Sequence, residues 1–251
     1  MSGARPQPWG DAKPQDLSLI KELPRLRVEY AKGDRLAFLG HLEVLETINR
    51  CIRRAQLPFS IGNGFARRMR IQFSQALPVG ASSVCEYFDL RLSEEVPVDE
   101  VLVSLRAATP LALAPSRAAY VDGRAPALES WLTRSCWKVL VLDCAVGASE
   151  LSGRIGAVRD AGVMEYLRGD KKKSIDVSGA LVSWECTDVK GGVALALDTR
   201  SSNAGALRPQ LLIDHALAGA AGEARGYDCL KVCRTSQAHE DANSGLLVNP
   251  L

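Results

Sequence analysis

Six arginines within one short stretch of the chain are the residues whose type and spacing best fit a chemical role. They are Arg50, Arg53, Arg54, Arg67, Arg68 and Arg70. A guanidinium group stays charged at physiological pH and presents a fork of donors that matches the oxygens of a phosphate. Clusters of such groups are typical of surfaces that neutralise the backbone of a nucleic acid. We therefore predict a nucleic-acid-binding surface made of these arginines together with His41.

The charge balance of this region supports the prediction. Residues 25–70 hold ten Lys or Arg against four Asp or Glu, whereas the whole chain has 31 against 29. Phe65 and Tyr87 are nearby aromatic residues that we expect to offer stacking area to bases. The alternative is a solvated helix face, on which Glu43 and Glu46 partly neutralise the arginines.

No set of residues in the sequence fits a catalytic centre. His41, His215 and His239 do not stand beside a serine or cysteine in a pattern typical of nucleophilic catalysis. Cys229 and Cys233 fall about 13 Å apart on a predicted strand, at roughly 3.3 Å per residue, which is too far to share a metal ion. The three closely spaced cysteines of a radical-SAM iron–sulfur site do not occur. We therefore expect no catalytic residue, no metal and no cofactor, which favours a protein that is not an enzyme.

Hydrophobic periodicity predicts an α+β unit in the first half of the chain. Residues 25–30 alternate as a half-buried strand does, and residues 41–55 place their apolar side chains along one stripe of a helix. Further strands are predicted at 70–75, 85–92 and 111–121, and a second helix at 97–108. The order β-α-β-β-α-β is that of a ferredoxin-like domain, which packs two helices on one face of a four-stranded sheet.

A second unit with a similar order of elements is predicted after a connector. Strands are expected at 137–145, 163–177, 181–188, 193–198 and 227–234, and helices at 149–161 and 209–218. The lysine run 171–173 interrupts the second of these strands and is expected to be the solvated tip of a hairpin. The predicted fold is therefore α+β, with two ferredoxin-like units in tandem. The predicted boundaries are a mobile N-terminal tail 1–24, a first domain 25–123 with the basic surface, a connector 124–134, a second domain 135–235 and a C-terminal tail 236–251.

The composition is that of a soluble cytoplasmic protein. Apolar residues make up 47% of the chain, yet no run approaches the roughly 20 apolar residues that are needed to cross a bilayer. The first residues lack the apolar segment of a signal peptide. The seven cysteines are an odd number without regular spacing, which is typical of a reducing compartment. We expect a cytoplasmic protein with no membrane partner.

Several segments resemble the radical-SAM-associated domain of unknown function. In the first half they are 25–33 (RLRVEYAKG), 38–43 (FLGHLE), 53–55 followed by Pro58, Gly64–Phe65, and 76–80 (ALPVG) followed by Glu86–Tyr87. In the second half they are 171–176 and 207–209, so that the resemblance extends over residues 25–235. That domain occurs fused to, or encoded beside, radical-SAM proteins of the cobalamin-binding type, and this chain resembles its stand-alone form. The resemblance implies a radical-SAM enzyme as partner and RNA as the class of substrate.

The chain departs from the pattern of that domain at two places. The serine and aspartate that usually flank the histidine at the start of the helix are replaced by Gly40 and Glu43, which can still cap the helix. Where the family commonly has Asn-Pro-His-Pro-Lys, this chain has residues 66–70 (ARRMR). Any role of that second histidine is therefore lost or is taken over by arginine.

These observations predict a non-catalytic accessory protein that binds RNA through the basic face, partners a radical-SAM enzyme, or does both, in RNA modification or processing. One alternative is an RNA-acting enzyme in its own right, with His41 as general acid–base and the arginines stabilising phosphate charge. Another alternative is a structural adaptor that does not bind RNA.

Overall fold

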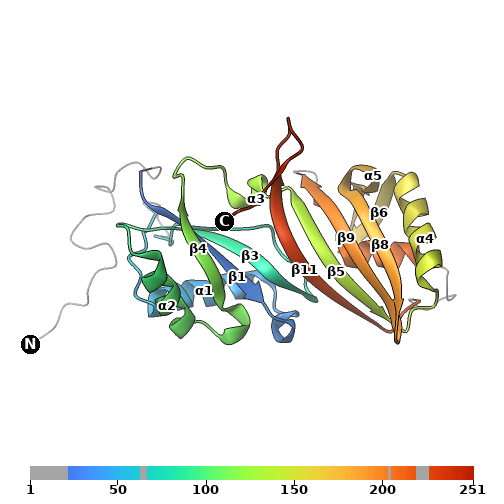
Figure 1. Cartoon of the computed structure of the whole chain (residues 1–251), viewed down its shortest axis with the longest axis horizontal. Helices are drawn as coiled ribbons and strands as arrows, with labels where there is room; N and C mark the ends of the chain where they lie inside the picture. Colours follow the sequence, from blue (N-terminus) through green and yellow to red (C-terminus); the bar gives the residue numbers. More distant parts are fainter. Residues whose placement is uncertain (1–21, 63–66, 203–204, 219–225) are drawn as a thin grey trace, which may run out of the picture. The chain divides into compact units, whose positions relative to one another are not determined.

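Two compact units of mixed α and β structure make up the protein, which is described here by a computed structural model (Figure 1). The structure describes residues 22–62, 67–202, 205–218 and 226–251. Unit 1 extends to Val79, resumes from Cys85 to Trp131 and includes Leu251, whereas unit 2 comprises Gly80–Val84 and Leu132–Pro250. The predicted α+β class is confirmed. No helix in the described ranges has both the length and the apolar character needed to cross a membrane.

Unit 1 is a sheet whose two long helices lie on one face. Its elements are β1 (Arg25–Lys32), α1 (His41–Arg54), β2 (Ile71–Phe73), β3 (Ala81–Arg91), α2 (Val98–Ala108), β4 (Pro115–Val121) and α3 (Leu128–Trp131). Strand β1 lies between β4 and β3, and the short strand β2 pairs antiparallel with β3 on its other edge. Helices α1 and α2 lie on the same face of this sheet (Figure 1).

The core of unit 1 explains why α1 forms. Val44, Ile48 and Ile52 are spaced by four residues, so they lie on one side of the helix and pack against Leu26 and Leu90 of the sheet. The helix begins after Gly40, whose backbone N–H donates to Glu43 Oε2 at 2.7 Å. This hydrogen bond satisfies one of the donors that a helix N-terminus otherwise leaves without a partner.

The opposite face of the sheet in unit 1 is also buried, although the sequence predicted a half-buried strand. Arg25 and Arg27 of β1 are each 4% exposed, because both guanidinium groups form ion pairs with Asp89 of β3. Trp131 covers this face as well, with the Arg27 guanidinium 5.0 Å from the centre of its ring. Most of the predicted connector therefore packs on unit 1, which extends to Trp131 instead of ending at residue 123.

Unit 2 is a second sheet with additional elements. They are β5 (Arg134–Leu142), α4 (Ala148–Asp160), β6 (Val163–Arg168), β7 (Lys171–Asp176), α5 (Val177–Ala180), β8 (Leu181–Val189), β9 (Gly192–Ser202), β10 (Gly205–Ala206), α6 (Pro209–Ala216), β11 (Cys229–Glu240) and β12 (Leu247–Val248). The strands follow the order β8-β9-β5-β11, and each neighbouring pair is antiparallel. Residues 81–83 of β3 pair in parallel with residues 232–234 of β11. Strands β6 and β7 form a separate hairpin, and its exposed lysines 171–173 follow directly after the turn.

The end of the chain differs from the prediction of a tail after residue 235. Strand β11 continues to Glu240, and the buried Gln237 pairs with Ser135 of β5. A β-bulge between Arg234 and Ser236 shifts the register, which hides the strand alternation in the sequence. At the other end, residues 1–21 of the predicted tail 1–24 lie outside the described residues, and Leu23 is buried.

The last residue of β11 supports a prediction about acid stability. Glu240 accepts hydrogen bonds from Arg200 at 2.6 Å and forms an ion pair with Arg134 at 2.8 Å. The Arg200 hydrogen bonds, followed by that of Arg134, lower the pKa of Glu240 from 4.5 to about 2. A carboxyl group whose pKa is lowered by folding stabilises the protein above its unfolded-state pKa and loses this effect as pH falls through its folded-state pKa.

We therefore expect Glu240→Gln to be less stable than the wild type at pH 7, with a difference that shrinks as pH falls from 4.5 to 2. Urea unfolding at pH 7, 4 and 2.5 measures the free energy of unfolding of both proteins. A difference that stays constant over this range would contradict the assigned role of Glu240.

Candidate nucleic-acid interface

Three of the six predicted arginines line one hollow in unit 1, which we call the arginine hollow. Arg50 and Arg53 come from α1, and Arg68 comes from the segment that precedes β2. Ile71 and Phe73 of β2 are among the apolar residues that line it, and its volume is about 490 Å³. Two stretches of sequence thus converge here, because β2 lies beside the helix that carries the first two arginines.

The charges around the arginine hollow are unbalanced. Glu46 is its only carboxylate among the described residues, against three guanidinium groups. None of the three arginines forms an ion pair with a carboxylate in the described ranges. Arg50 donates a long, 3.4 Å hydrogen bond to the hydroxyl of Thr47 in its own helix. The hollow therefore presents donors for phosphate oxygens beside an apolar surface.

The remaining three arginines of the predicted surface lie elsewhere. Arg54 and Arg67 are exposed and do not line the hollow, and Arg67 has a φ of +42°. Arg70 lines a different pocket, together with Gln72. Side chains alternate along an extended chain. Arg70 and Gln72 therefore point to one side, whereas Met69 and Phe73, on either side of Ile71, point to the other side and line the hollow. The predicted single surface is thus divided into two sites.

His41 begins α1 but does not line the arginine hollow. It is half-buried, and its ring meets the ring of Phe73 edge-on, with 6.2 Å between their centres. Burial is the main cause that lowers the pKa of His41, and the carboxylate of Glu86 opposes this effect. The described residues contain no cluster of three or more His, Cys, Asp or Glu side chains suited to a metal ion.

The expectation that Tyr87 stacks on bases is wrong. Its side chain is buried, and its hydroxyl donates a 2.7 Å hydrogen bond to Glu29 on the face of the sheet opposite α1. Tyr87 occupies the strand position next to Phe88, which points into the core, so the alternation of β3 places the two rings on opposite faces. Phe65, the other predicted stacking residue, lies outside the described residues.

Lys32 is a positioning residue that the sequence patterns did not single out. Its ammonium group is buried and donates 2.9 Å hydrogen bonds to the backbone carbonyls of Ala37 and Leu39. Burial lowers the pKa of Lys32. These bonds hold the loop that leads into α1, and hence the helix that carries Arg50 and Arg53. The sequence could have indicated that Lys32 points inward, because Val28, Tyr30 and Lys32 occupy alternate positions of β1 and the first two face the core.

The chain is similar to the members of one protein family and to a solved structure of low sequence identity. No curated protein matches the sequence. A chain in the structure titled "Crystal Structure of a Cbf5-Nop10-Gar1 Complex" is similar, with a TM-score of 0.45 and 11% sequence identity. The match covers 91% of this chain and 54% of that chain, so this chain spans about half the length of the solved one. Residues 25–209 match a family model, and the chain therefore belongs to the family described as "Uncharacterized protein conserved in bacteria (DUF2344)".

Proposed function

We propose that this protein binds single-stranded RNA in the arginine hollow and acts as a non-catalytic accessory protein. The observation that carries the proposal is that three guanidinium groups, none ion-paired with a carboxylate of the described residues, surround an apolar-lined hollow. Guanidinium groups bind phosphate oxygens with paired, charge-assisted hydrogen bonds.

The lining of the hollow favours a single strand over a duplex. Phe73 and Ile71 add apolar surface beside the arginines, and unstacked bases bind such surfaces while the backbone contacts the cations. A duplex keeps its bases stacked inside, so the apolar lining would contribute little to its binding. RNA is proposed as the nucleic acid because it is the substrate class that the sequence resemblance implies.

A salt titration tests the proposal. Binding of a fluorescent single-stranded RNA is measured by anisotropy from 50 to 200 mM salt, with the wild type and the triple variant R50Q/R53Q/R68Q. Each lost phosphate contact lowers the slope of log affinity against log salt by about 0.7. We expect the triple variant to bind at least about tenfold more weakly, with a slope smaller by about 2.

The matched control is K171Q/K172Q/K173Q in unit 2, which removes the same charge from an exposed strand. We expect its affinity to change by less than the affinity of the arginine variant. Equal losses in both variants would overturn the assignment to the hollow, because only the total charge would then matter. If the wild type does not bind RNA at 50 mM salt, the RNA-binding function is overturned and the structural adaptor remains as the alternative function.

The rival function is an RNA-acting enzyme that uses His41. His41 lies outside the arginine hollow, and we therefore prefer a binding role to a catalytic one. Incubation of the pure protein with cellular RNA, followed by mapping of the products, separates the two functions. Products that form with the wild type and disappear with His41→Ala would establish the rival.

Two finer predictions stand as proposals. We infer that both units are ferredoxin-like, which the strand orders β4-β1-β3-β2 and β8-β9-β5-β11 support, with β6, β7 and α5 as an insertion in unit 2. The partnership with a radical-SAM enzyme rests on the sequence resemblance. Co-purification of such an enzyme after ribonuclease treatment of the cell extract would support it.

A further inference from the structure

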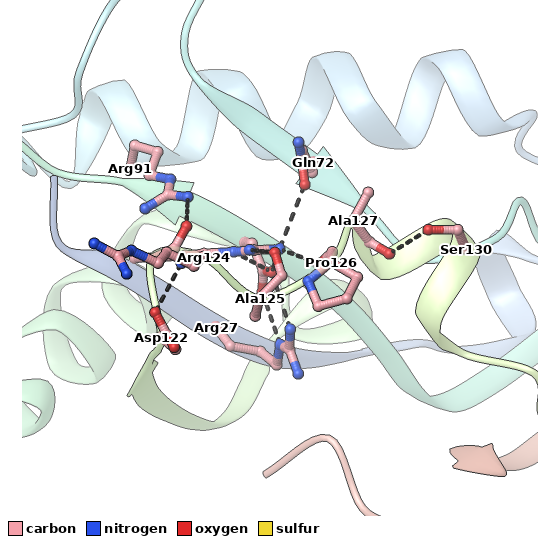
Figure 2. Close-up of polar contacts among 12 residues, drawn as sticks. Arg27, Gln72, Arg91, Asp122, Arg124, Ala125, Pro126, Ala127 and Ser130 are labelled. Carbon is pink, nitrogen blue, oxygen red and sulfur yellow. Dashed lines mark hydrogen bonds and ion pairs between the residues drawn. The ribbon is translucent and has the colours of Figure 1, made fainter. Parts of the chain in front are cut away.

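Unit 1 contains a second arginine-rich cavity, which we call the arginine pocket. Its volume is about 300 Å³, and it is lined by Arg25, Arg70, Arg91, Arg124 and Asp89 together with the backbone near Ala125. Arg91 lies beside the segment that carries Arg124 and leads to Pro126, as Figure 2 shows. Four guanidinium groups thus meet one carboxylate.

Both oxygens of the Asp89 carboxylate already accept hydrogen bonds from arginines. Asp89 Oδ2 accepts a 2.7 Å hydrogen bond from Arg25 Nε, and Asp89 Oδ1 lies 2.8 Å from Arg27 Nε. Arg25 completes its contacts with the carbonyls of Ala125 and Pro126, which fixes it in place. Asp89 therefore forms its ion pairs with Arg25 and Arg27, and it acts on Arg91 only as a neighbouring charge.

The other three arginines have no carboxylate partner among the described residues. Arg91 donates to the neutral carbonyls of Leu23 at 2.8 Å and Gly123 at 2.5 Å. Burial, followed by the neighbouring charges of Arg25 and Arg70, lowers the pKa of Arg91, and the carboxylates of Asp89 and Asp122 oppose this effect. The Nη1 atom of Arg70 is shielded from solvent and has no hydrogen-bond partner in the part of the chain that the structure describes. A buried donor without an acceptor is unfavourable, and an anion in the pocket would supply the missing acceptor.

We propose that the arginine pocket binds a phosphate group, held between the guanidinium groups of Arg70, Arg91 and Arg124. A phosphate dianion matches this site because its oxygens can accept from several guanidinium groups at once and because its charge offsets their mutual repulsion. The pocket goes beyond the proposed function, since its binding of phosphate does not require RNA in the arginine hollow.

The phosphate has two possible sources with the same chemistry. Ile71 lines both the hollow and the pocket, so the two sites flank the edge strand β2. The terminal phosphate of an RNA strand that lies in the hollow is one source, and the phosphate of a free nucleotide is the other. The experiment separates them by comparing an RNA with a 5′-phosphate, the same RNA with a 5′-hydroxyl, and AMP.

Calorimetric titration with inorganic phosphate at constant ionic strength tests the site itself. The wild type is expected to bind phosphate, and Arg70→Gln is expected to weaken the binding at least about tenfold, the effect of losing about 1.4 kcal/mol. Arg70→Lys keeps the positive charge but loses the fork of donors. Its affinity for phosphate is expected to lie between those of the wild type and Arg70→Gln, which would show that the loss in Arg70→Gln does not come from unfolding. Arg67→Gln is the control, because Arg67 is exposed and lines neither cavity.

The outcomes distinguish this proposal from the proposed function. The variant R50Q/R53Q/R68Q is expected to lose RNA affinity while it still binds inorganic phosphate. Tighter binding of the 5′-phosphorylated RNA than of the 5′-hydroxyl RNA supports the pocket with a strand terminus, and binding of AMP without that difference supports it with a free nucleotide. If the wild type binds none of inorganic phosphate, AMP and the terminal phosphate, or if Arg67→Gln and Arg70→Gln weaken binding equally, the proposal is overturned.

Discussion

Asp89→Ala is expected to lower the free energy of unfolding by about 3–5 kcal/mol, because it leaves buried charges without their partner. Asp89 is 3% exposed and forms ion pairs with both Arg25 and Arg27, each of which is 4% exposed. Both guanidinium groups are almost entirely shielded from water, and the ring of Trp131 covers that of Arg27. Urea unfolding followed by circular dichroism measures the change.

The control for this prediction is Glu150→Gln, which breaks the exposed pair between Glu150 and Arg154 in α4. Exposed pairs one helical turn apart contribute only about 0.3–0.5 kcal/mol. A loss of similar size in the two variants would mean that the pair formed by Asp89 is hydrated in solution, contrary to its burial.

Gly192→Ala is expected to destabilise unit 2 by about 3 kcal/mol through backbone strain. Gly192 starts β9 with a φ of +158°, and a Cβ atom built on it would lie 2.0 Å from the carbonyl oxygen of Val141 in β5. Because that obstacle is backbone, the strands must separate locally, and the pairing of β5 with β9 weakens. Thermal unfolding gives the effect as a lowered Tm.

Gly153→Ala is the matched control for the second prediction. Gly153 lies within α4, and no other atom would come within 4 Å of the new methyl group. Alanine in the interior of a helix is favoured over glycine by about 0.5–1 kcal/mol, so this variant is expected to raise the Tm. If both variants were equally stable, the close approach at Gly192 would not carry the assigned strain.

The elements with simple periodicity could be predicted from the sequence. The apolar stripe through Val44, Ile48 and Ile52 predicted a helix over 41–55, and α1 spans His41–Arg54. The stripe also placed Arg50 and Arg53 on the solvent side, where both line the arginine hollow. These predictions held because each depends on residues within one helix.

Features that depend on residues far apart in the sequence could not be predicted. Arg25 and Arg27 alternate with apolar residues, which is typical of a solvated strand face, yet Asp89 pairs with both across more than 60 positions of sequence. Arg70 was grouped with Arg68 because the two are close in the chain. Strand alternation would place both on one side, but Arg68 and Arg70 precede the regular strand β2, so Arg68 lines the hollow and Arg70 lines the pocket.

Strand β3 has a consequence for the order in which the chain acquires its structure. Its first residues belong to unit 2, where Ser82 donates to the carbonyl of Val232 at a separation of 150 residues, and its remaining residues belong to unit 1. Pairings of such high contact order form slowly, because the loop-closure entropy is lost before the contacts form. During synthesis, residues 81–83 must wait until β11 has left the ribosome. Separate expression of residues 132–251 would leave the partner edge of β11 bare, a template for aggregation.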